Sequence, residues 1–354
     1  MLFAAVLFAT IAAVDAPDIS VSASPRPTYI SADANGQSLS VDLIIDNQSG
    51  GALDLDEVQI SVFDRAGKLV LRRFIDGNGT RPSIRTADAP DLPAHASTLV
   101  FNPFHDFAPD VDLASVRFDL QLSTKDGSRR FAESVTVNPV PYRSRSLILP
   151  LKNRMIVYDG HDFYAHHRRW DYMIPQLRQL GFRTNFMRYS YDFVPVDDAG
   201  NMSSGPEEKN ESWFGFGQPV RAVAGGVVTA VVDRNPDDRT FDPSTIATDG
   251  PMKIWGNYVV VDHGGGEYAL YGHIQHGSSR VKAGQRVRQG DVLAAVGAAG
   301  SSKFPHLHFE LQTGPDVSAE GLPSVFENFD RILGSRRVRV KSGRVNSGDI
   351  LQSR

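Results

Sequence analysis

Residues 305–311 read Pro305-His306-Leu307-His308-Phe309-Glu310-Leu311, and the fold of the C-terminal half is indicated most clearly by this stretch. Side chains of a β-strand alternate between two faces, so the two histidines and the glutamate share one face while the three apolar side chains point into a core. Two imidazoles side by side over an apolar sheet face are a natural start for a metal site. The H-x-H pattern alone is a weak signal, because two surface histidines would give the same letters.

The composition limits how such a metal can be held. The chain has 354 residues, which predicts about two domains, and it contains no cysteine, so a metal must be bound by His, Asp or Glu. Eight of the ten histidines fall between His161 and His308. The 37 Lys and Arg residues nearly balance the 41 Asp and Glu residues, for a net charge of −4, so we expect no nucleic-acid partner.

The first residues are typical of an export signal. Leu2 to Val14 is an uncharged apolar run, too short to span a membrane, and Ala12, Ala13 and Ala16 offer cleavage points. We therefore expect residues 1–16 to be a signal peptide, no transmembrane segment after its removal, and a mature protein in the periplasm or cell envelope. An apolar first strand of the next domain is the alternative interpretation of the same run.

Residues 17–141 are predicted to form a β-sandwich of immunoglobulin-like architecture. Seven short runs alternate apolar with polar residues and are separated by turn signals: ISVSAS, LSVDLIID, VQISVFD, LVLRRFI, STLVFNP, SVRFDLQL and AESVTVNP. His95 and His105 are isolated, so this half shows no titratable cluster. We interpret it as a spacer or a binding module.

The rest of the chain divides into three predicted parts. Residues 142–157 form a linker and a leading strand after the proline pair Pro139 and Pro141, residues 158–334 form the second domain, and residues 335–354 form a basic C-terminal tail. Inside the second domain, Tyr172–Leu180 is a short helix candidate with Pro175 in its first turn, and 197–216 reads as a surface loop. The tail alternates like an edge strand and would also suit anionic wall polymers.

Several motifs of the second domain occur in a recognisable order. Gly217-Gln218-Pro219-Val220-Arg221-Ala222 comes first, Tyr271-Gly272-His273 follows, and the strand at 305–311 closes the series. From about Tyr158 to Gln312 the sequence resembles the LytM/lysostaphin-type zinc metallopeptidases. The resemblance implies an antiparallel β-sheet peptidase domain, so we expect an all-β chain of two domains.

The resemblance also implies roles for three histidines. His308 matches the metal ligand of the H-x-H pair, His306 matches the partner that acts on the water molecule, and His273 matches a third active-site histidine that stabilises the oxyanion. One Zn²⁺ per active site is the implied cofactor.

The other two ligands are less clearly marked by the sequence. The family usually supplies them as H-x-x-x-D, a spacing that His167 and Asp171 have. Asp192, however, ends an alternating run in a Y-x-x-D-F pattern and precedes the Gly217 motif in the family order. We therefore expect His167, Asp192 and His308 to bind the metal, although His167 and Asp192 lie 25 residues apart. His161, His166 and Asp171 remain competing candidates.

The implied activity is a zinc-dependent metalloendopeptidase that hydrolyses peptide cross-links of peptidoglycan. A meso-diaminopimelate cross-link is the leading candidate for the bond and a glycine bridge is the second. A non-catalytic envelope scaffold or activator with the same fold, and a protein-directed zinc protease, remain alternatives. Nothing in the sequence indicates an oligomeric state.

Overall fold

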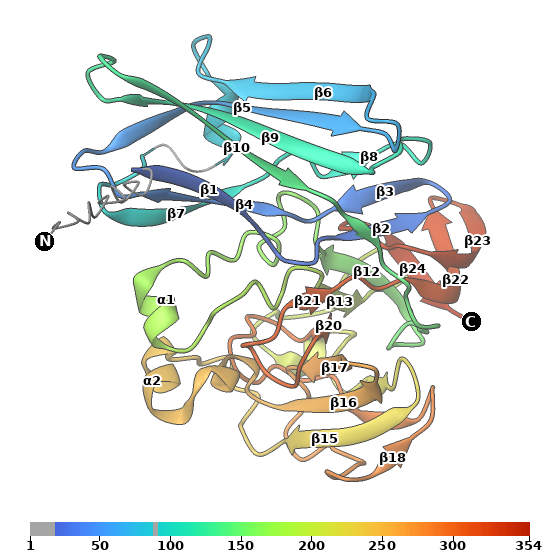
Figure 1. Cartoon of the computed structure of the whole chain (residues 1–354). Coiled ribbons are helices and arrows are strands. Elements are labelled where there is room, and N and C mark those ends of the chain that lie inside the picture. The colour runs from blue at the N-terminus through green and yellow to red at the C-terminus, as the bar shows by residue number, and fades with distance from the viewer. Residues whose placement is uncertain (1–17, 88–90) are drawn as a thin grey trace, which may run out of the picture.

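The computed structural model of the protein describes residues 18–87 and 91–354 (Figure 1). The expected signal peptide, residues 1–16, lies outside these ranges. The regular secondary structure of the described chain is almost entirely β-strand, which confirms the expected all-β fold class. Within the described ranges, no helix is long and apolar enough to cross a lipid bilayer.

The N-terminal part contains two antiparallel sheets with a shared core. The three-stranded sheet has the order β1 (Ile19–Ser24), β4 (Asp42–Asn47), β7 (Ala96–Phe101), and the four-stranded sheet has the order β10 (Arg130–Val137), β9 (Ser115–Thr124), β5 (Leu53–Phe63), β6 (Leu69–Asp76). One cluster of buried apolar side chains includes Leu43 and Ile45 from the first sheet and Ile60 and Phe118 from the second. The seven runs found in the sequence therefore correspond to strands that enclose one core.

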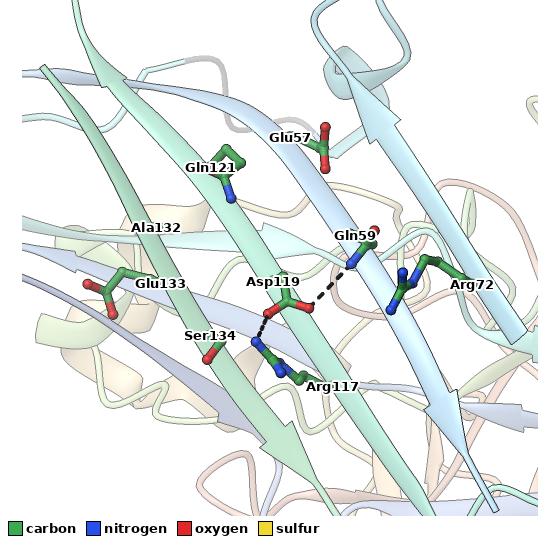
Figure 2. A pocket seen from close by; sticks show the side chains of 9 residues that line it. All are labelled: Glu57, Gln59, Arg72, Arg117, Asp119, Gln121, Ala132, Glu133 and Ser134. Carbon is green, nitrogen blue, oxygen red and sulfur yellow. Dashed lines mark hydrogen bonds and ion pairs between the residues drawn. The ribbon is translucent and has the colours of Figure 1, made fainter. Parts of the chain in front are cut away.

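Strand β9 shows why alternation produces this arrangement. Val116, Phe118, Leu120 and Leu122 are fully buried, and the polar residues between them point the other way. Figure 2 shows that outer face, where Arg117 contacts Asp119 at 2.6 Å. The hollow lined by these side chains contains no histidine.

A third sheet joins the N-terminal part to the linker. Its order is β11 (Val140–Pro141), β2 (Tyr29–Asp33), β3 (Gly36–Leu39), β8 (Asp106–Phe107). The proline-containing strand β11 pairs in parallel with β2, and Glu267 accepts hydrogen bonds of 2.8 Å from both Tyr142 and Arg145. The start of the expected linker is therefore held between β2 and Glu267 of the C-terminal part.

The C-terminal part is organised around an eleven-stranded sheet. Its order is β18 (Arg286–Val287), β15 (Gly226–Val232), β16 (Tyr258–Gly264), β17 (Glu267–Gly272), β20 (Leu307–Gln312), β13 (Tyr191–Pro195), β12 (Arg154–Asp159), β24 (Ile350–Ser353), β22 (Phe326–Leu333), β23 (Arg336–Gly343), with β21 (Gly321–Leu322) paired to β20. A separate pair joins β14 (Pro219–Arg221) to β19 (Val292–Ala295). The described helical turns are α1 (Pro175–Gln179), α2 (Ile246–Asp249), η1 (Ser83–Ala87), η2 (Asn210–Ser212), η3 (Pro243–Thr245) and η4 (Pro251–Trp255).

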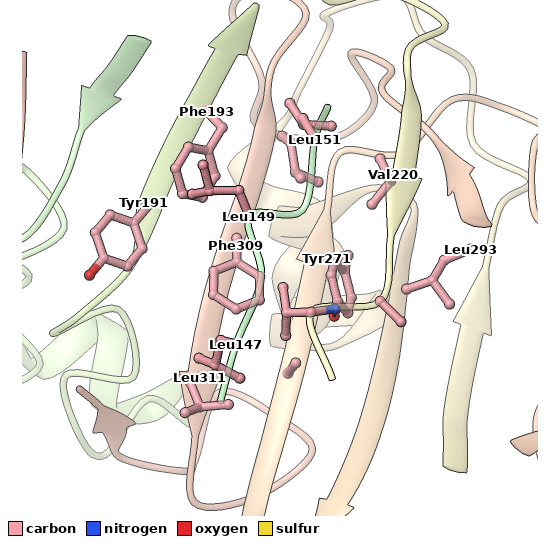
Figure 3. Close-up of a cluster of buried hydrophobic side chains, with 14 of the residues drawn as sticks. Leu147, Leu149, Leu151, Tyr191, Phe193, Val220, Tyr271, Leu293, Phe309 and Leu311 are labelled. Atoms are coloured by element: carbon pink, nitrogen blue, oxygen red, sulfur yellow. Dashed lines mark hydrogen bonds between the residues drawn. The ribbon is translucent and has the colours of Figure 1, made fainter. Parts of the chain in front are cut away.

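Strand β20 lies in the middle of this sheet with both faces covered. Leu307, Phe309 and Leu311 pack into the main core beside Tyr191 and Phe193 (Figure 3), as the alternation predicted. The other face of the strand is also buried, and there it carries polar side chains instead of apolar ones. Buried polar groups need hydrogen-bond or ion-pair partners, so this face of β20 is a candidate for a functional site.

Three local expectations differ in detail from the structure. Helix α1 does start at Pro175, as the first-turn argument required, but it is only five residues long. Strand β13 starts at Tyr191, so Asp192 stands near its beginning and not at the end of a run, because turn hydrogen bonds such as Ser190 N–H to Met187 O occupy the preceding backbone. Residues 335–354 form β23, an edge strand, and β24, which pairs with β12 and β22 inside the sheet.

Candidate metal centre

The strand register brings the candidate residues into one row across the sheet. Asp192 on β13 pairs with His308 on β20, and His308 pairs in turn with Gly272 at the end of β17. On the other side of β13, Asp192 pairs with Asp159 at the end of β12. Neighbouring strands are about 4.8 Å apart, so this register alone places the four positions side by side.

His167 reaches the same row from the loop between β12 and α1. Its side chain is 1% exposed, and its Nε2 lies 3.4 Å from Asp192 Oδ1. Gly272 allows the close packing on the other side, because a Cβ there would meet Trp255 at 3.2 Å and His308 at 3.3 Å. The indole of Trp255 packs against the His308 ring with centroids 4.2 Å apart, which closes this side of the centre with an apolar wall.

A single oxygen of Asp192 contacts three imidazoles. Asp192 Oδ1 lies 3.4 Å from His167 Nε2, 3.4 Å from His306 Nε2 and 3.1 Å from His308 Nδ1. All four side chains are nearly inaccessible to solvent. The three ligands expected from the sequence and the expected general base therefore meet at one point.

The outer nitrogen of each imidazole has an acceptor. His167 Nδ1 lies 3.3 Å from Gly160 O, His306 Nδ1 lies 2.8 Å from Phe304 O, and His308 Nε2 lies 3.3 Å from Glu310 Oε2. Carbonyl and carboxylate oxygens only accept, so we assign the ring proton to the outer nitrogen in each case. The inner nitrogens of His167 and His306 then direct lone pairs at Asp192 Oδ1. Lone pairs and a carboxylate repel one another unless a cation lies between them.

The charge states agree with a cation-binding centre. Burial lowers the pKa of His167 well below its usual value, so this imidazole is neutral and able to bind a metal. Burial would raise the pKa of the Asp192 carboxyl, but the imidazoles of His167 and His306 outweigh it and hold that pKa well below its usual range. Burial would lower the pKa of His308, yet hydrogen bonds to Asp192 and Glu310 raise it to about 9. In the metal-free protein, a proton on His308 supplies the cation.

Carboxylates also lie behind the two histidines that are expected to bind the metal. Glu310, which is 1% exposed, contacts His308 Nε2 and accepts a 2.9 Å hydrogen bond from Ser190 Oγ. Asp159 Oδ2 lies 3.3 Å from His167 Nδ1 and accepts a 3.1 Å hydrogen bond from the His166 backbone N–H. Carboxylates behind metal-bound histidines fix the ring orientation and raise ligand basicity.

Asp159 is the residue that sequence reasoning missed. Asp159, His166, His167 and Asp192 offer ligand atoms that all lie within 4.8 Å of one another, a second grouping that overlaps the first. His166 is exposed, and its Nδ1 pairs with Asp159 at 2.5 Å. We favour the buried grouping around Asp192 Oδ1, since it excludes water and brings together the inner nitrogens of three imidazoles. An aspartate at a strand end usually indicates a turn, and only its register opposite Asp192 gives it another meaning.

The other competing candidates have different partners. The Nε2 of His161 lies 3.1 Å from the Tyr191 hydroxyl, and burial lowers the pKa of this imidazole to about 4. Asp171 accepts a 2.8 Å hydrogen bond from the Met173 backbone N–H. The structure thus places His167 against Asp192, whereas His161 contacts the Tyr191 hydroxyl and the Asp171 carboxylate contacts the Met173 backbone.

His273 lies beside the centre in an unusual backbone conformation. Its φ of 59° is rare for a residue with a side chain, and such strain is often found at functional sites. The Nδ1 of His273 lies 2.8 Å from Ala299 O, and its ring centroid is 4.8 Å from that of His306. Burial lowers the pKa of His273 well below its usual value, and His306 and His308 lower it further. The resting imidazole is therefore neutral, with Nε2 free to accept a proton.

Aromatic side chains border the centre near His306. Phe304 lies 5.1 Å from the His306 ring, and Trp213 of the expected surface loop stacks on Phe304 with centroids 4.9 Å apart. The exposed ring of Tyr158 meets Phe304 edge-on at 4.9 Å. The loop is thus packed against the border of the centre instead of extending into solvent.

Comparison with known proteins identifies part of this domain. The sequence model described as Peptidase family M23 matches residues 214–319. The matched region contains His273, His306 and His308, whereas His167 and Asp192 precede it.

Three curated relatives are similar over short segments. The cell division protein DipM of Caulobacter vibrioides is 41% identical over 72 residues, 20% of this chain and 12% of DipM. The murein hydrolase activator EnvC of Escherichia coli is 43% identical over 61 residues, 17% of this chain and 14% of EnvC. The DD-carboxypeptidase/endopeptidase Mpg of Neisseria meningitidis serogroup B is 35% identical over 96 residues, 27% of this chain and 17% of Mpg. The matches therefore span less than a fifth of each relative.

Solved structures include an M23 catalytic domain among the matches. A mutant catalytic domain of the prophage-encoded M23 protein EnpA from Enterococcus faecalis aligns with 37% of this chain over 93% of its own length. The two are 20% identical, with a TM-score of 0.24.

Proposed function

Because the chain contains a Peptidase family M23 domain at residues 214–319, we propose that the protein is a zinc-dependent endopeptidase that hydrolyses peptide cross-links of peptidoglycan. The observation that carries this proposal is the convergence of three imidazole nitrogens on one oxygen of Asp192. His167, Asp192 and His308 would hold the metal. Two nitrogens and a carboxylate oxygen suit zinc, and three protein ligands are the usual set for a catalytic zinc site.

The chemistry of the site follows from the tautomers. Bound zinc would supply a Lewis acid that lowers the pKa of a water molecule from its high value in bulk water to about 7. His306 presents an unprotonated Nε2, so it can take the proton of the water that attacks the peptide carbonyl. As the C–N bond breaks, the same nitrogen returns that proton to the leaving amine.

His273 has a separate role in this proposal. A neutral His273, whose Nδ1–H donates to Ala299 O, offers only an acceptor at Nε2. It would donate to the oxyanion of the tetrahedral intermediate in its imidazolium form, with a second proton taken up at Nε2 from solvent water before the attack. Donors of this kind contribute about 3–4 kcal/mol to transition-state stabilisation. The positive φ of His273 and its contact with Ala299 O hold the ring at a fixed angle beside His306.

The substrate and the compartment rest on the relatives and on the first residues. Mpg is named a DD-carboxypeptidase/endopeptidase and EnvC a murein hydrolase activator, which supports peptidoglycan as the substrate. A meso-diaminopimelate cross-link is the leading candidate bond, with a glycine bridge second. Export to the periplasm or cell envelope completes the proposal, since the substrate is found there.

The test is the His306→Ala variant in a peptidoglycan release assay. We expect hydrolysis to fall to background while the purified variant keeps one zinc, because His306 acts on water and does not hold the metal. His276→Ala is the matched control, since His276 is exposed and makes its described hydrogen bond through its backbone N–H. Unchanged hydrolysis by His306→Ala would contradict the assigned role. A wild-type protein that binds no zinc after refolding with metal would be a scaffold or activator.

A further inference from the structure

The loop that carries His167 has little regular structure of its own. Between the end of β12 at Asp159 and the start of α1 at Pro175 the chain forms turns and bends. A metal ligand on such a segment needs support from elsewhere, because a site works only when its ligands are held within about 0.5 Å of the productive geometry.

That support comes from the N-terminal sandwich. Phe163 and Tyr172, near the two ends of the loop, form one buried apolar cluster with Leu99 and Phe101 of β7. Arg169 lies over the Phe101 ring at 4.9 Å. The loop is therefore packed between the sandwich and the sheet that carries Asp192 and His308.

The centre of this contact is a fully buried carboxylate. Asp42, at the start of β4, is 0% exposed, and so are the two arginines that contact it. Arg168 NH1 lies 2.5 Å from Asp42 Oδ1, and Arg188 NH1 lies 2.6 Å from Asp42 Oδ2. Each carboxylate oxygen of Asp42, which belongs to the sandwich, thus contacts one arginine of the C-terminal part.

Both arginines lie close in the sequence to proposed metal ligands. Arg168 follows His167 directly, and its NH2 also donates to Val41 O at 3.0 Å, while Asn185 donates to the Arg168 carbonyl at 3.0 Å. Arg188 lies four residues before Asp192, and its Nε contacts Glu320 at 2.6 Å. Fixing these two side chains fixes the backbone on which His167 and Asp192 approach each other.

We propose that Asp42 is a positioning residue of the metal centre, so that the sandwich completes the site instead of serving as a spacer. The proposal rests on the proposed function, since it concerns the geometry of the same metal ligands. In the absence of Asp42, the two buried guanidinium groups lose the carboxylate that they share, and Glu320 remains beside Arg188. Buried charges that lose a partner are strongly unfavourable, so the His167 loop moves to bring Arg168 to water.

The test compares Asp42→Asn with wild type in the full-length protein. Competition with a chromophoric chelator measures the zinc dissociation constant, which we expect to rise about 10- to 100-fold, as is typical when a group that orients metal ligands is lost. The visible absorption spectrum of the cobalt-substituted protein should change as well, since it reports ligand geometry. Asp119→Asn is the matched control, because it removes a sandwich carboxylate that pairs with Arg117 on the outer face (Figure 2).

A second measurement needs no metal. In the metal-free protein, hydrogen–deuterium exchange of the amides at 161–169 should be faster in Asp42→Asn than in wild type or Asp119→Asn. If Asp42→Asn does not fold, Arg168→Lys replaces it, since lysine keeps the charge but lacks the planar fork through which Arg168 contacts Asp42 and Val41 O with two separate nitrogens. In Arg168→Lys we expect weaker zinc binding, an altered cobalt spectrum and faster amide exchange, each by a smaller amount than in Asp42→Asn.

The outcomes separate this inference from the proposed function. Wild-type zinc affinity, an unchanged cobalt spectrum and unchanged exchange in the Asp42 variant would overturn the positioning role while leaving the peptidase proposal intact. A wild-type protein that binds no zinc overturns the peptidase proposal, and the exchange experiment then still decides whether Asp42 orders the loop.

Discussion

At the scale of single residues, the Asp192 carboxylate is the side chain on which the centre depends. Its Oδ1 contacts nitrogens of His167, His306 and His308, which come from three separate parts of the chain. Because the outer nitrogens have acceptors already, the inner ones of His167 and His308 are available to a metal and that of His306 is available to a proton. The carboxylate supplies the negative charge that makes this arrangement favourable.

The variant Asp192→Asn is expected to lose zinc. An amide has the shape of the carboxylate but not its charge, so we expect the zinc dissociation constant to rise by more than the roughly 10- to 100-fold typical of supporting residues. Metal content after dialysis and chelator competition measure the change. Asp171→Asn is the comparison, because Asp171 is the competing ligand candidate and an amide oxygen can still accept the hydrogen bond from the Met173 N–H. Loss of zinc in Asp171→Asn with retention in Asp192→Asn would reverse the ligand assignment.

At the scale of elements, two loops meet closely enough to exclude side chains. Gly256 follows η4 with φ 60°, and a Cβ there would lie 2.2 Å from Gly300 N. Gly300 is equally constrained, since its Cβ would lie 2.3 Å from Gly256 N. This contact holds Trp255 against His308 and Ala299 O within reach of His273.

Gly256→Ala should therefore impair turnover more than metal binding. The methyl group forces the loops apart by about 1 Å, which displaces Ala299 and with it His273, and misplacement of that size can cost about 100-fold in rate. The measurement is kcat together with zinc content. Gly266→Ala is the control, because Gly266 has a similar positive φ of 80° but open space around its Cβ position. Equal effects in the two variants would mean that φ strain, and not the close approach, is responsible.

At the scale of the whole molecule, the metal would join distant segments. His167, Asp192 and His308 come from a loop and two strands, so zinc bound in the folded state but not in the unfolded chain stabilises the fold. The contribution is about 4 kcal/mol when free zinc is a thousandfold above the dissociation constant. The Asp42 contacts then extend this stabilisation to the sandwich.

Chelation should consequently lower the thermal midpoint of wild type. About 4 kcal/mol corresponds to roughly 8–16 °C in a domain of 150–250 residues, since each kcal/mol shifts the midpoint by about 2–4 °C. Thermal unfolding followed by circular dichroism with and without EDTA measures the shift. Asp192→Asn should show no response to EDTA, and the absence of a response in wild type would argue against a metal in this centre.

The strands and the chemical type of the site could be predicted from the amino-acid sequence. Alternation in runs such as 115–122 and 305–311 identified the side chains that face a core, because strand geometry has a period of two residues. The lack of cysteine and the grouping of histidines limited a metal site to nitrogen and carboxylate ligands. Sequence spacing alone did not show which of His161, His166 and His167, or which of Asp171 and Asp192, would bind the metal.

Which of these residues meet became clear from the tertiary structure alone. Asp159, Asp192, His308 and Gly272 become neighbours through strand register, which depends on pairing between segments far apart in the chain. The contacts of Asp42 with Arg168 and Arg188 are equally invisible in the sequence, since they join positions more than 120 residues apart. Local patterns report the conformation of a segment, whereas a site assembled from several segments is determined by how they pack.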